Sequence, residues 1–341
     1  MADVEGQDKA GYNIMVLSSE CSKELAPNTE EFTNHFVEKV IPELHADGVF
    51  GEDVVVIGHN IQPVGGYGEN HWMSCTLRVA VEVQDRKLKT TRTVRLVAKY
   101  QSGDSVWLDS AVTMRNEEHM YNQVVPLFQS LWDESSHGDP EPLNLFPKCY
   151  RAVSGARPLV VMDDMGADGF RLATSTTALD GAHVFLALNR LGRLHALSYC
   201  AKIRRKDDFL SVARELQDAE YSESRRAYQT GFIGGLMGPL LRRLAARGES
   251  VIDATTCEHL RHRLRSERED IPSGAFDIML EARSAEEPLA VIAHGDFCRN
   301  NIMFKYDAAT GRPVDVRFFD LQTAKYVQEQ QQQRRAASVV R

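Results

Sequence analysis

Residues 291–322, "VIAHGDFCRNNIMFKYDAATGRPVDVRFFDLQ", contain acidic and amide side chains at a spacing that suits phosphoryl transfer. Asp296 follows His294 by two residues, Asn301 lies five residues after Asp296, and Asp320 lies near the end. In phosphoryl transfer an aspartate takes the proton of the attacking hydroxyl, an asparagine five residues later holds Mg²⁺, and a second aspartate holds the metal against the phosphates. We therefore predict Asp296, Asn301 and Asp320 as catalytic, with Asn301 and Asp320 as metal ligands.

The segment between Asn301 and Asp320 has the pattern of a β-hairpin. Apolar residues are followed by the turn letters "AATGRP" and then by alternation at Val314, Val316 and Phe318. A hairpin would return the chain so that Asp320 comes back beside Asn301. The alternative without catalysis is a solvated loop in which the Asp and Asn residues only form turns.

The first half of the chain offers a cation and a carboxylate that such a site also needs. Lys99 ends the apolar strand "RLVAK", where a lysine can contact phosphates or simply extend its amine from a strand edge into water. Glu117 shares the apolar stripe of its predicted helix with Met114 and Tyr121. A carboxylate on a buried stripe is costly unless it is paired. We therefore predict an ion pair between Lys99 and Glu117.

Two further segments could contact a nucleotide, and their alternative interpretations are an ordinary turn and an ordinary strand end. The turn "GGYGEN" at 65–70, with Gly68 and Asn70, could bring backbone N–H groups close to phosphate, although no G-K-[ST] follows it. The segment "VVMDDM", with Met162 and Asp163, lies where a connection between two lobes would bind an adenine edge through its backbone.

Other polar residues near these motifs receive structural interpretations. His195 lies on a helix among leucines and is expected in the core. His294 is expected to orient the Asp296 loop by hydrogen bonding and not to act as a base. Cys298 has no accompanying pattern of a nucleophile. Arg299 could contact phosphate or face solvent.

The chain divides into a β-rich front and a helical back. Residues 1–30 are an irregular lead-in, 31–165 form the predicted N-lobe, 166–326 the C-lobe, and 327–341 a glutamine-rich tail that we expect to be disordered or weakly helical. The predicted elements, in order, are a helix at 30–44, three antiparallel strands over 53–100, a helix at 110–131, a strand at 157–165, and helices at 178–202, 207–230, 235–247 and 254–267.

Composition and charge argue against several classes of protein. The 341 residues are 43% hydrophobic and 26% charged, as in ordinary globular proteins, and a formal charge of −8 argues against nucleic acid as a partner. No apolar run reaches the roughly 18 residues of a membrane span, and the first residues lack a secretion signal. Six scattered cysteines fit free thiols. A cytoplasmic location without membrane contact is the expectation, and oligomeric state is open.

A series of longer motifs resembles one family. "GENHWMS", "VAKY", "PLVVMDDM", "LGRLHALS", "HGDFCRNNIMFKYD" and "VDVRFFDLQ" occur in that order. Together they resemble the choline-kinase-like and ecdysteroid-kinase-like proteins, also labelled juvenile-hormone-inducible, over residues 40–326. The resemblance implies an α+β, bilobed, protein-kinase-like fold, ATP with Mg²⁺, and a small-molecule alcohol as acceptor. It assigns Asp296 as the base, Asn301 and Asp320 as metal ligands, and Lys99 with Glu117 as the phosphate-side pair.

The chain departs from the family pattern at two places. Cys298 stands where the family has a tryptophan, a change that we expect to be tolerated. Family members continue for about seventy or more residues after "D-x-Q", so we expect this chain to lack the C-terminal helices of the family. We expect exposed apolar surface on the back lobe as a consequence.

Three functions are compatible with the sequence. The first is an ATP- and Mg²⁺-dependent phosphotransferase acting on an alcohol, with an ecdysteroid-like sterol or a choline-like molecule as acceptor. The second is a catalytically silent nucleotide-binding or interaction protein of the same fold. The third is a metal-dependent phosphoesterase using His294, Asp296 and Asp320, which would require a further ligand cluster.

Overall fold

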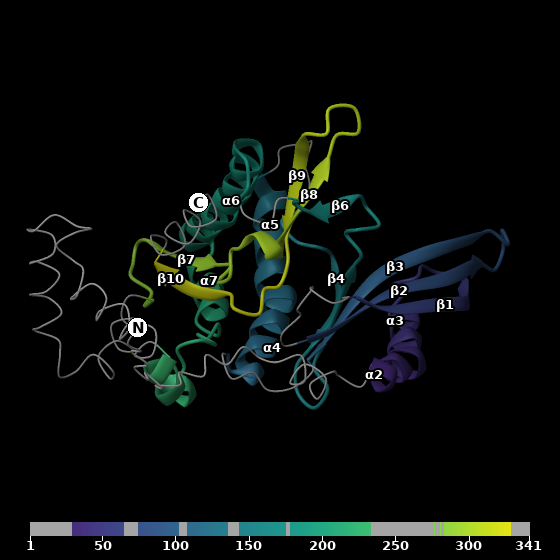
Figure 1. The fold of residues 1–341 in the computed structure, drawn as a ribbon, viewed down its shortest axis with the longest axis horizontal. Helices are drawn as coiled ribbons and strands as arrows, with labels where there is room; N and C mark the ends of the chain where they lie inside the picture. The colour runs from purple at the N-terminus through teal and green to yellow at the C-terminus, as the bar shows by residue number, and fades with distance from the viewer. Residues whose placement is uncertain are drawn as a thin grey trace, which may run out of the picture.

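A computed structural model describes residues 29–64, 74–101, 108–135, 143–174, 178–232, 276, 280 and 283–328 of the chain. It is an α+β structure in which an antiparallel sheet lies beside a larger part that contains the longest described helix and two small sheets (Figure 1). Among the described residues, no helix is both long and apolar enough to cross a bilayer.

The larger sheet has five strands in the order β1-β2-β3-β5-β4, and all neighbouring strands are antiparallel. The strands are β1 (Val54–Val64), β2 (Ser74–Asp85), β3 (Thr91–Gln101), β4 (Cys149–Val153) and β5 (Leu159–Asp163). The predicted three-stranded meander and the strand at 157–165 are confirmed. The sequence analysis did not assign β4, a short strand in which Ala152 is the one buried residue.

One face of this sheet is covered by the N-terminal helical segment. The segment comprises α2 (Thr29–His35), the π-helical turn η1 (Phe36–Val40) and α3 (Ile41–Ala46), as the predicted helix at 30–44 requires. Alternate strand residues face it, as a period of two demands. This smaller core includes Phe36, Leu44, Phe50, Leu77, Val79, Val81, Leu96, Ala98, Tyr100 and Val161.

The chain between β3 and β4 forms helix over the predicted region but with one irregular turn. It is made of α4 (Ser110–His119), the π-helical turn η2 (Met120–Val124) and α5 (Val125–Ser135). Helix α4 begins where the carboxylate of Asp109 accepts a hydrogen bond from the N–H of Val112. Pro126 follows the π turn by two residues and has no N–H to continue the regular pattern.

The larger part of the molecule is built around α6 (Gly181–Arg204), which starts at the N-cap Asp180. Helix α7 (Lys206–Ala213) follows, so the predicted single helix at 207–230 is wrong. After Ala213 the carboxylate of Asp218 accepts N–H bonds from Glu220 and Tyr221, a local turn that competes with helix. The predicted helices at 235–247 and 254–267 lie outside the described residues.

Two small antiparallel sheets complete this part. Strands β6 (Phe170–Leu172), β8 (Ile302–Tyr306) and β9 (Pro313–Phe318) form one in the order β6-β8-β9, and β8 with β9 is the predicted hairpin. Strands β7 (Ala290–Ala293) and β10 (Lys325–Gln328) form the other. Strand β10 therefore takes in Val327 and Gln328, the first two residues assigned to the tail; the remaining tail lies outside the described residues.

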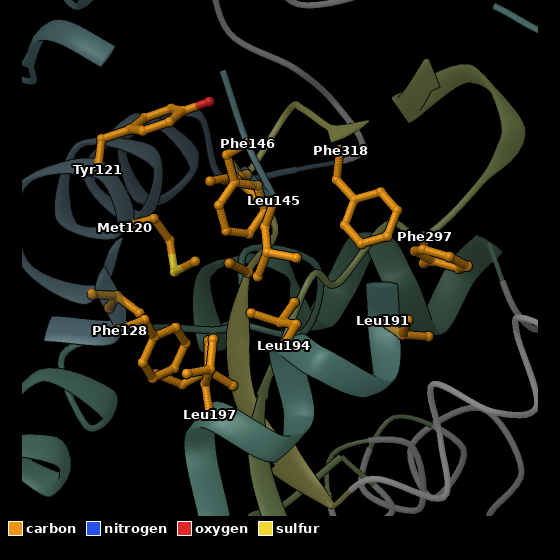
Figure 2. Packing of buried hydrophobic residues seen from close by; sticks show 14 of the residues in the cluster. Met120, Tyr121, Phe128, Leu145, Phe146, Leu191, Leu194, Leu197, Phe297 and Phe318 are labelled. Carbon is orange, nitrogen blue, oxygen red and sulfur yellow. The ribbon is translucent and has the colours of Figure 1, made fainter. Parts of the chain in front are cut away.

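The main hydrophobic core joins the helices between β3 and β4 to α6 and to the β8–β9 hairpin. Figure 2 shows this packing, with Phe297 and Phe318 side by side at the end nearest Leu191. The rings of Phe297 and Phe318 meet edge to face with centroids 5.2 Å apart. Residues that follow β7 and residues that end β9 are thereby fixed against each other, next to Asp296 and Asp320.

Candidate active site

The β8–β9 hairpin carries Asn301 and Asp320 to the same end of a sheet. Ile302 pairs directly with Phe318, so Asn301 immediately precedes the paired strands and Asp320 follows them by two residues. The N–H of Phe319 donates to the carbonyl of Asn301 over 3.1 Å. The spacing of nineteen residues, which looks remote in the sequence, is therefore a close approach in the fold.

Asp296 lies in the loop after the buried strand β7 and is held by Asn301. The Nδ2 atom of Asn301 donates to the backbone carbonyl of Asp296 and to its Oδ2, each over 3.0 Å. These bonds use the amide nitrogen, so the carboxamide oxygen is the atom with which Asn301 would hold a cation. Asp296 and Asn301 thus form one structural unit.

The Asp296 loop and the loop after Asp320 approach each other through Gly295. Its backbone has φ +86°, and a Cβ atom built there would lie 1.7 Å from the carbonyl oxygen of Thr323. Any side chain would therefore have to push this backbone away. Only glycine allows both the positive φ and the close contact, which fixes the separation of the two acidic loops.

His294 links the same two loops by a hydrogen bond. It is fully buried, and its Nε2 lies 2.9 Å from the carbonyl oxygen of Phe319, the residue before Asp320. Because that carbonyl can only accept, Nε2 carries the proton. Burial lowers the pKa of His294, although Asp320 and Asp296 act in the opposite direction. The expected orienting contact is therefore present, and the ring is neutral.

Lys99 is the cation at the centre of the site. Its Nζ lies 2.7 Å from Glu117 Oε2, 2.7 Å from Asp320 Oδ1 and 3.3 Å from Gln322 Oε1. The predicted contact with Glu117 is present, and Glu117 has 0% exposure. Burial disfavours the charge of Lys99, but the carboxylates of Asp320 and Glu117 outweigh it and raise the lysine pKa above its usual range. Lys99 therefore stays protonated.

Asp320 is held in an uncommon backbone conformation. Its φ is +65°, in the left-handed region that residues other than glycine seldom adopt. One carboxylate oxygen contacts Lys99, and the other accepts from Gln322 Nε2 over 3.4 Å. Strained non-glycine residues persist where surrounding contacts determine them and are concentrated at functional sites.

Glu117 is positioned by the residue before it, Asn116. The Nδ2 atom of Asn116 donates to the carbonyl of Gln217 over 2.7 Å and lies 3.3 Å from the carbonyl of Ala324, while its Oδ1 accepts from the N–H of Gln217 over 3.1 Å. These bonds tie α4 to the segment after α7 and to the segment after Asp320. The sequence analysis missed Asn116 and Gln322, because neither belongs to a spacing pattern.

The other residues predicted to bind the nucleotide lie in the turn at 65–70 and in the segment around Met162. Gly68 and Asn70 lie outside the described residues. The N–H of Asp163 donates to the carbonyl of Lys148 and its carboxylate accepts from Tyr150 Oη, and the N–H of Asp164 donates to the carbonyl of Arg95. These N–H groups are committed within the fold, so a backbone contact to an adenine edge must use other groups of this segment. Met162 is paired between β3 and β4 and buried.

Two residues with structural interpretations behave accordingly. His195 is buried on α6, in the core as expected. Burial raises the pKa of the Cys298 thiol to about 11, with Asp296 adding to the shift, so the thiol stays protonated at neutral pH. A protonated thiol is a poor nucleophile.

The donor set fits a magnesium ion better than a softer metal. Asp320 and Asn301 offer hard oxygen atoms, and Mg²⁺ takes one or two protein oxygens together with water and phosphate. In the part of the chain that the structure describes, no group of three or more His, Cys, Asp and Glu side chains is placed to hold a metal ion. The ligand cluster that a phosphoesterase would require is therefore not found among these residues.

Two comparisons with known proteins bear on the family of the chain. A protein-family model described as the ecdysteroid kinase-like family matches residues 68–328, which is more than half of the chain and includes every predicted site residue. A search of curated proteins returned no match.

Proposed function

The chain belongs to the ecdysteroid kinase-like family, and from this premise we propose that it is an ATP- and Mg²⁺-dependent phosphotransferase acting on an alcohol group of a small molecule. Membership points to a kinase-like phosphotransferase. The observation that carries the finer proposal is the buried contact of Lys99 with both Glu117 and Asp320. It places a permanent cation beside a carboxylate that can bind metal, which a triphosphate with its metal requires.

Each residue has a role that follows from its surroundings. Lys99 would contact the phosphates, and Glu117 keeps its ammonium group in place. Asp320 and Asn301 would hold Mg²⁺, which neutralises negative charge on the phosphates. Asp296 accepts the proton of the acceptor hydroxyl while the hydroxyl oxygen bonds to the γ-phosphorus. The bond between the γ-phosphorus and the oxygen that leaves with ADP breaks in the same step. Asn301 fixes the Asp296 carboxylate in the orientation for this step.

The acceptor proposed is an alcohol of ecdysteroid type, with a choline-like alcohol as the other class. The family description supports the first. The net charge of −8 is a property of the whole chain and does not decide between a neutral and a cationic acceptor.

Thermal unfolding of the purified chain with and without Mg²⁺-ATP tests the nucleotide site. Ligand at about a hundred times its Kd should add about 2.7 kcal/mol to the free energy of unfolding, which raises the melting temperature by a few degrees. Asp320→Asn should lose the Mg²⁺-dependent part of the shift.

Phosphorylation of the acceptor tests the chemistry. ADP formation that depends on an ecdysteroid or on choline should fall at least about a hundredfold in Asp296→Asn, because proton transfer contributes that much or more. Nucleotide binding in Asp296→Asn should persist. A nucleotide-dependent shift without transfer to any alcohol would instead identify a silent nucleotide-binding protein.

A further inference from the structure

Arg78 lies on the face of the large sheet that carries Lys99. Arg78 pairs with Val97 on β3, and Val97 precedes Lys99 by two residues, so all three side chains are on one face. Two residues along a strand correspond to about 7 Å. The outer face, which carries Ala98 and Leu77, packs instead against the N-terminal helices.

A buried carboxylate anchors Arg78 to the segment that follows β5. The Nε atom of Arg78 lies 3.0 Å from Asp164 Oδ2. The side chain of Arg78 is 54% exposed, whereas that of Asp164 is 6% exposed. The second oxygen of Asp164 accepts from the N–H of Gly166 over 2.9 Å. The carboxylate is therefore fixed from two sides and the guanidinium from one edge.

Much of the arginine side chain remains open to a ligand. In the described residues, Asp164 is the partner that the structure gives Arg78, and it is contacted through Nε. A guanidinium held by one edge presents a flat, positively charged face, and such faces stack on aromatic rings.

The position of Arg78 favours contact with the base of a nucleotide over contact with its phosphates. The phosphate-binding groups Lys99 and Asp320 meet at one point, and Arg78 reaches away from it, toward the segment between the two parts of the molecule. The N–H groups of Asp163 and Asp164 are used within the fold. Recognition of the base is thus left to other groups, and Arg78 lies on this face with its guanidinium held by Asp164.

We propose that Arg78, held by Asp164, stacks on the purine base of the nucleotide and is a specificity-determining residue of the site. This inference rests on the proposed function, because it assumes that the phosphates lie at Lys99. Asp164 is a positioning residue that acts through Arg78.

Binding of two probes separates a contact with the base from a contact with phosphate. Isothermal titration with Mg²⁺-ATP and with Mg²⁺-tripolyphosphate, which lacks the base, is compared across variants of the full chain. Arg78→Ala should weaken Mg²⁺-ATP about tenfold and leave tripolyphosphate within twofold. Arg78→Lys keeps the charge but loses the plane, so it should weaken Mg²⁺-ATP nearly as much.

Arg151→Ala is the matched control. Arg151 is an arginine of the same sheet, ion-paired over 3.0 Å to Glu43 on the face that carries the N-terminal helices, and its removal should change neither affinity. Asp164→Asn should weaken Mg²⁺-ATP without affecting tripolyphosphate, since Arg78 then loses its anchor.

Each other outcome has a definite meaning. Unchanged Mg²⁺-ATP binding in Arg78→Ala would overturn the inference, and so would an equal loss for both probes, which would make Arg78 a phosphate contact. Lys99→Met must weaken both probes. If the wild-type chain binds neither, the proposed function fails and this inference with it; if it binds both and Arg78→Ala changes nothing, only the inference fails.

Discussion

A single buried lysine organises the polar residues of the site. Lys99 contacts Glu117, Asp320 and Gln322, which come from a helix and from the loop after β9. A buried carboxylate such as Glu117 would be costly without a cation. The ion pair therefore explains at once why Glu117 can lie at 0% exposure and how the two parts of the molecule meet at this point.

His294 makes the stability of the protein depend on pH. Burial lowers its pKa from the ordinary value of 6.5, so below pH 6.5 the unfolded chain binds a proton that the folded protein does not. Stability is therefore lost as pH falls from 7 to 5, by up to about 1.4 kcal/mol per pH unit from this residue. His294→Gln should show a smaller fall, measured by urea denaturation at pH 7, 6 and 5.

The control for His294→Gln is the same substitution at a histidine outside the site. His59→Gln removes an exposed histidine from β1 and controls for the loss of a histidine as such. Equal pH dependence in His294→Gln and in the wild type would contradict the neutral, buried state assigned to this ring.

At the scale of elements, two glycines with similar backbone angles should differ in importance. Gly295 has φ +86° and Gly311, in the turn between β8 and β9, has φ +67°; a Cβ at Gly295 meets the Thr323 carbonyl, whereas nothing lies within 4 Å at Gly311. Gly311→Ala should cost about 1–2 kcal/mol, from backbone strain alone. Gly295→Ala should cost more than about 4 kcal/mol, because two loops must separate.

Urea denaturation of both variants measures the difference, and titration with Mg²⁺-ATP adds a second readout. Gly311→Ala should bind nucleotide normally, while any folded Gly295→Ala protein should bind it weakly. Similar destabilisation in the two variants would show that the contact between the Asp296 loop and the Asp320 loop is looser than the structure indicates.

At the scale of the whole molecule, an ion network joins three segments that are far apart in the sequence. Arg283 Nε lies 2.6 Å from Asp218 Oδ2, Lys325 Nζ lies 3.3 Å from the same oxygen, and Arg283 also contacts Glu220. The side chains of Arg283 and Lys325 are 4% and 8% exposed. The network fastens β10 and the residues before β7 to the turn after α7.

Removing the shared carboxylate should unfold the protein more easily than removing a surface partner. Asp218→Ala leaves two cations buried with less compensation and should cost about 3–5 kcal/mol. Glu43→Ala breaks the half-exposed pair with Arg151 and should cost less than about 1 kcal/mol. Chemical denaturation of the two variants checks this, and comparable losses would mean that solvent reaches Arg283 and Lys325.

Local patterns in the sequence were sufficient for several features. β-Branched and alternating residues predict strands β1 to β3 and the β8–β9 hairpin, and the apolar stripe around Glu117 predicts a carboxylate that needs Lys99. These features depend on neighbours within a few residues or on the cost of burying one charge. The roles of Asp296, Asn301 and Asp320 in catalysis stay predictions that the experiments above test.

Other features required the tertiary structure. The contact of Lys99 with Asp320 spans 221 residues, and the bond of Asn116 to the carbonyl of Gln217 spans 101. The pair of Arg78 with Asp164 depends on the register of β2 on β3 and on the path of the chain after β5. The turn at Asp218, which follows α7, is held by the ion network as well as by its own hydrogen bonds. Residue types and local patterns establish which residues can carry charge and which segments form helices or strands. Packing and strand register decide which of these residues meet, because those distances are set by the whole fold.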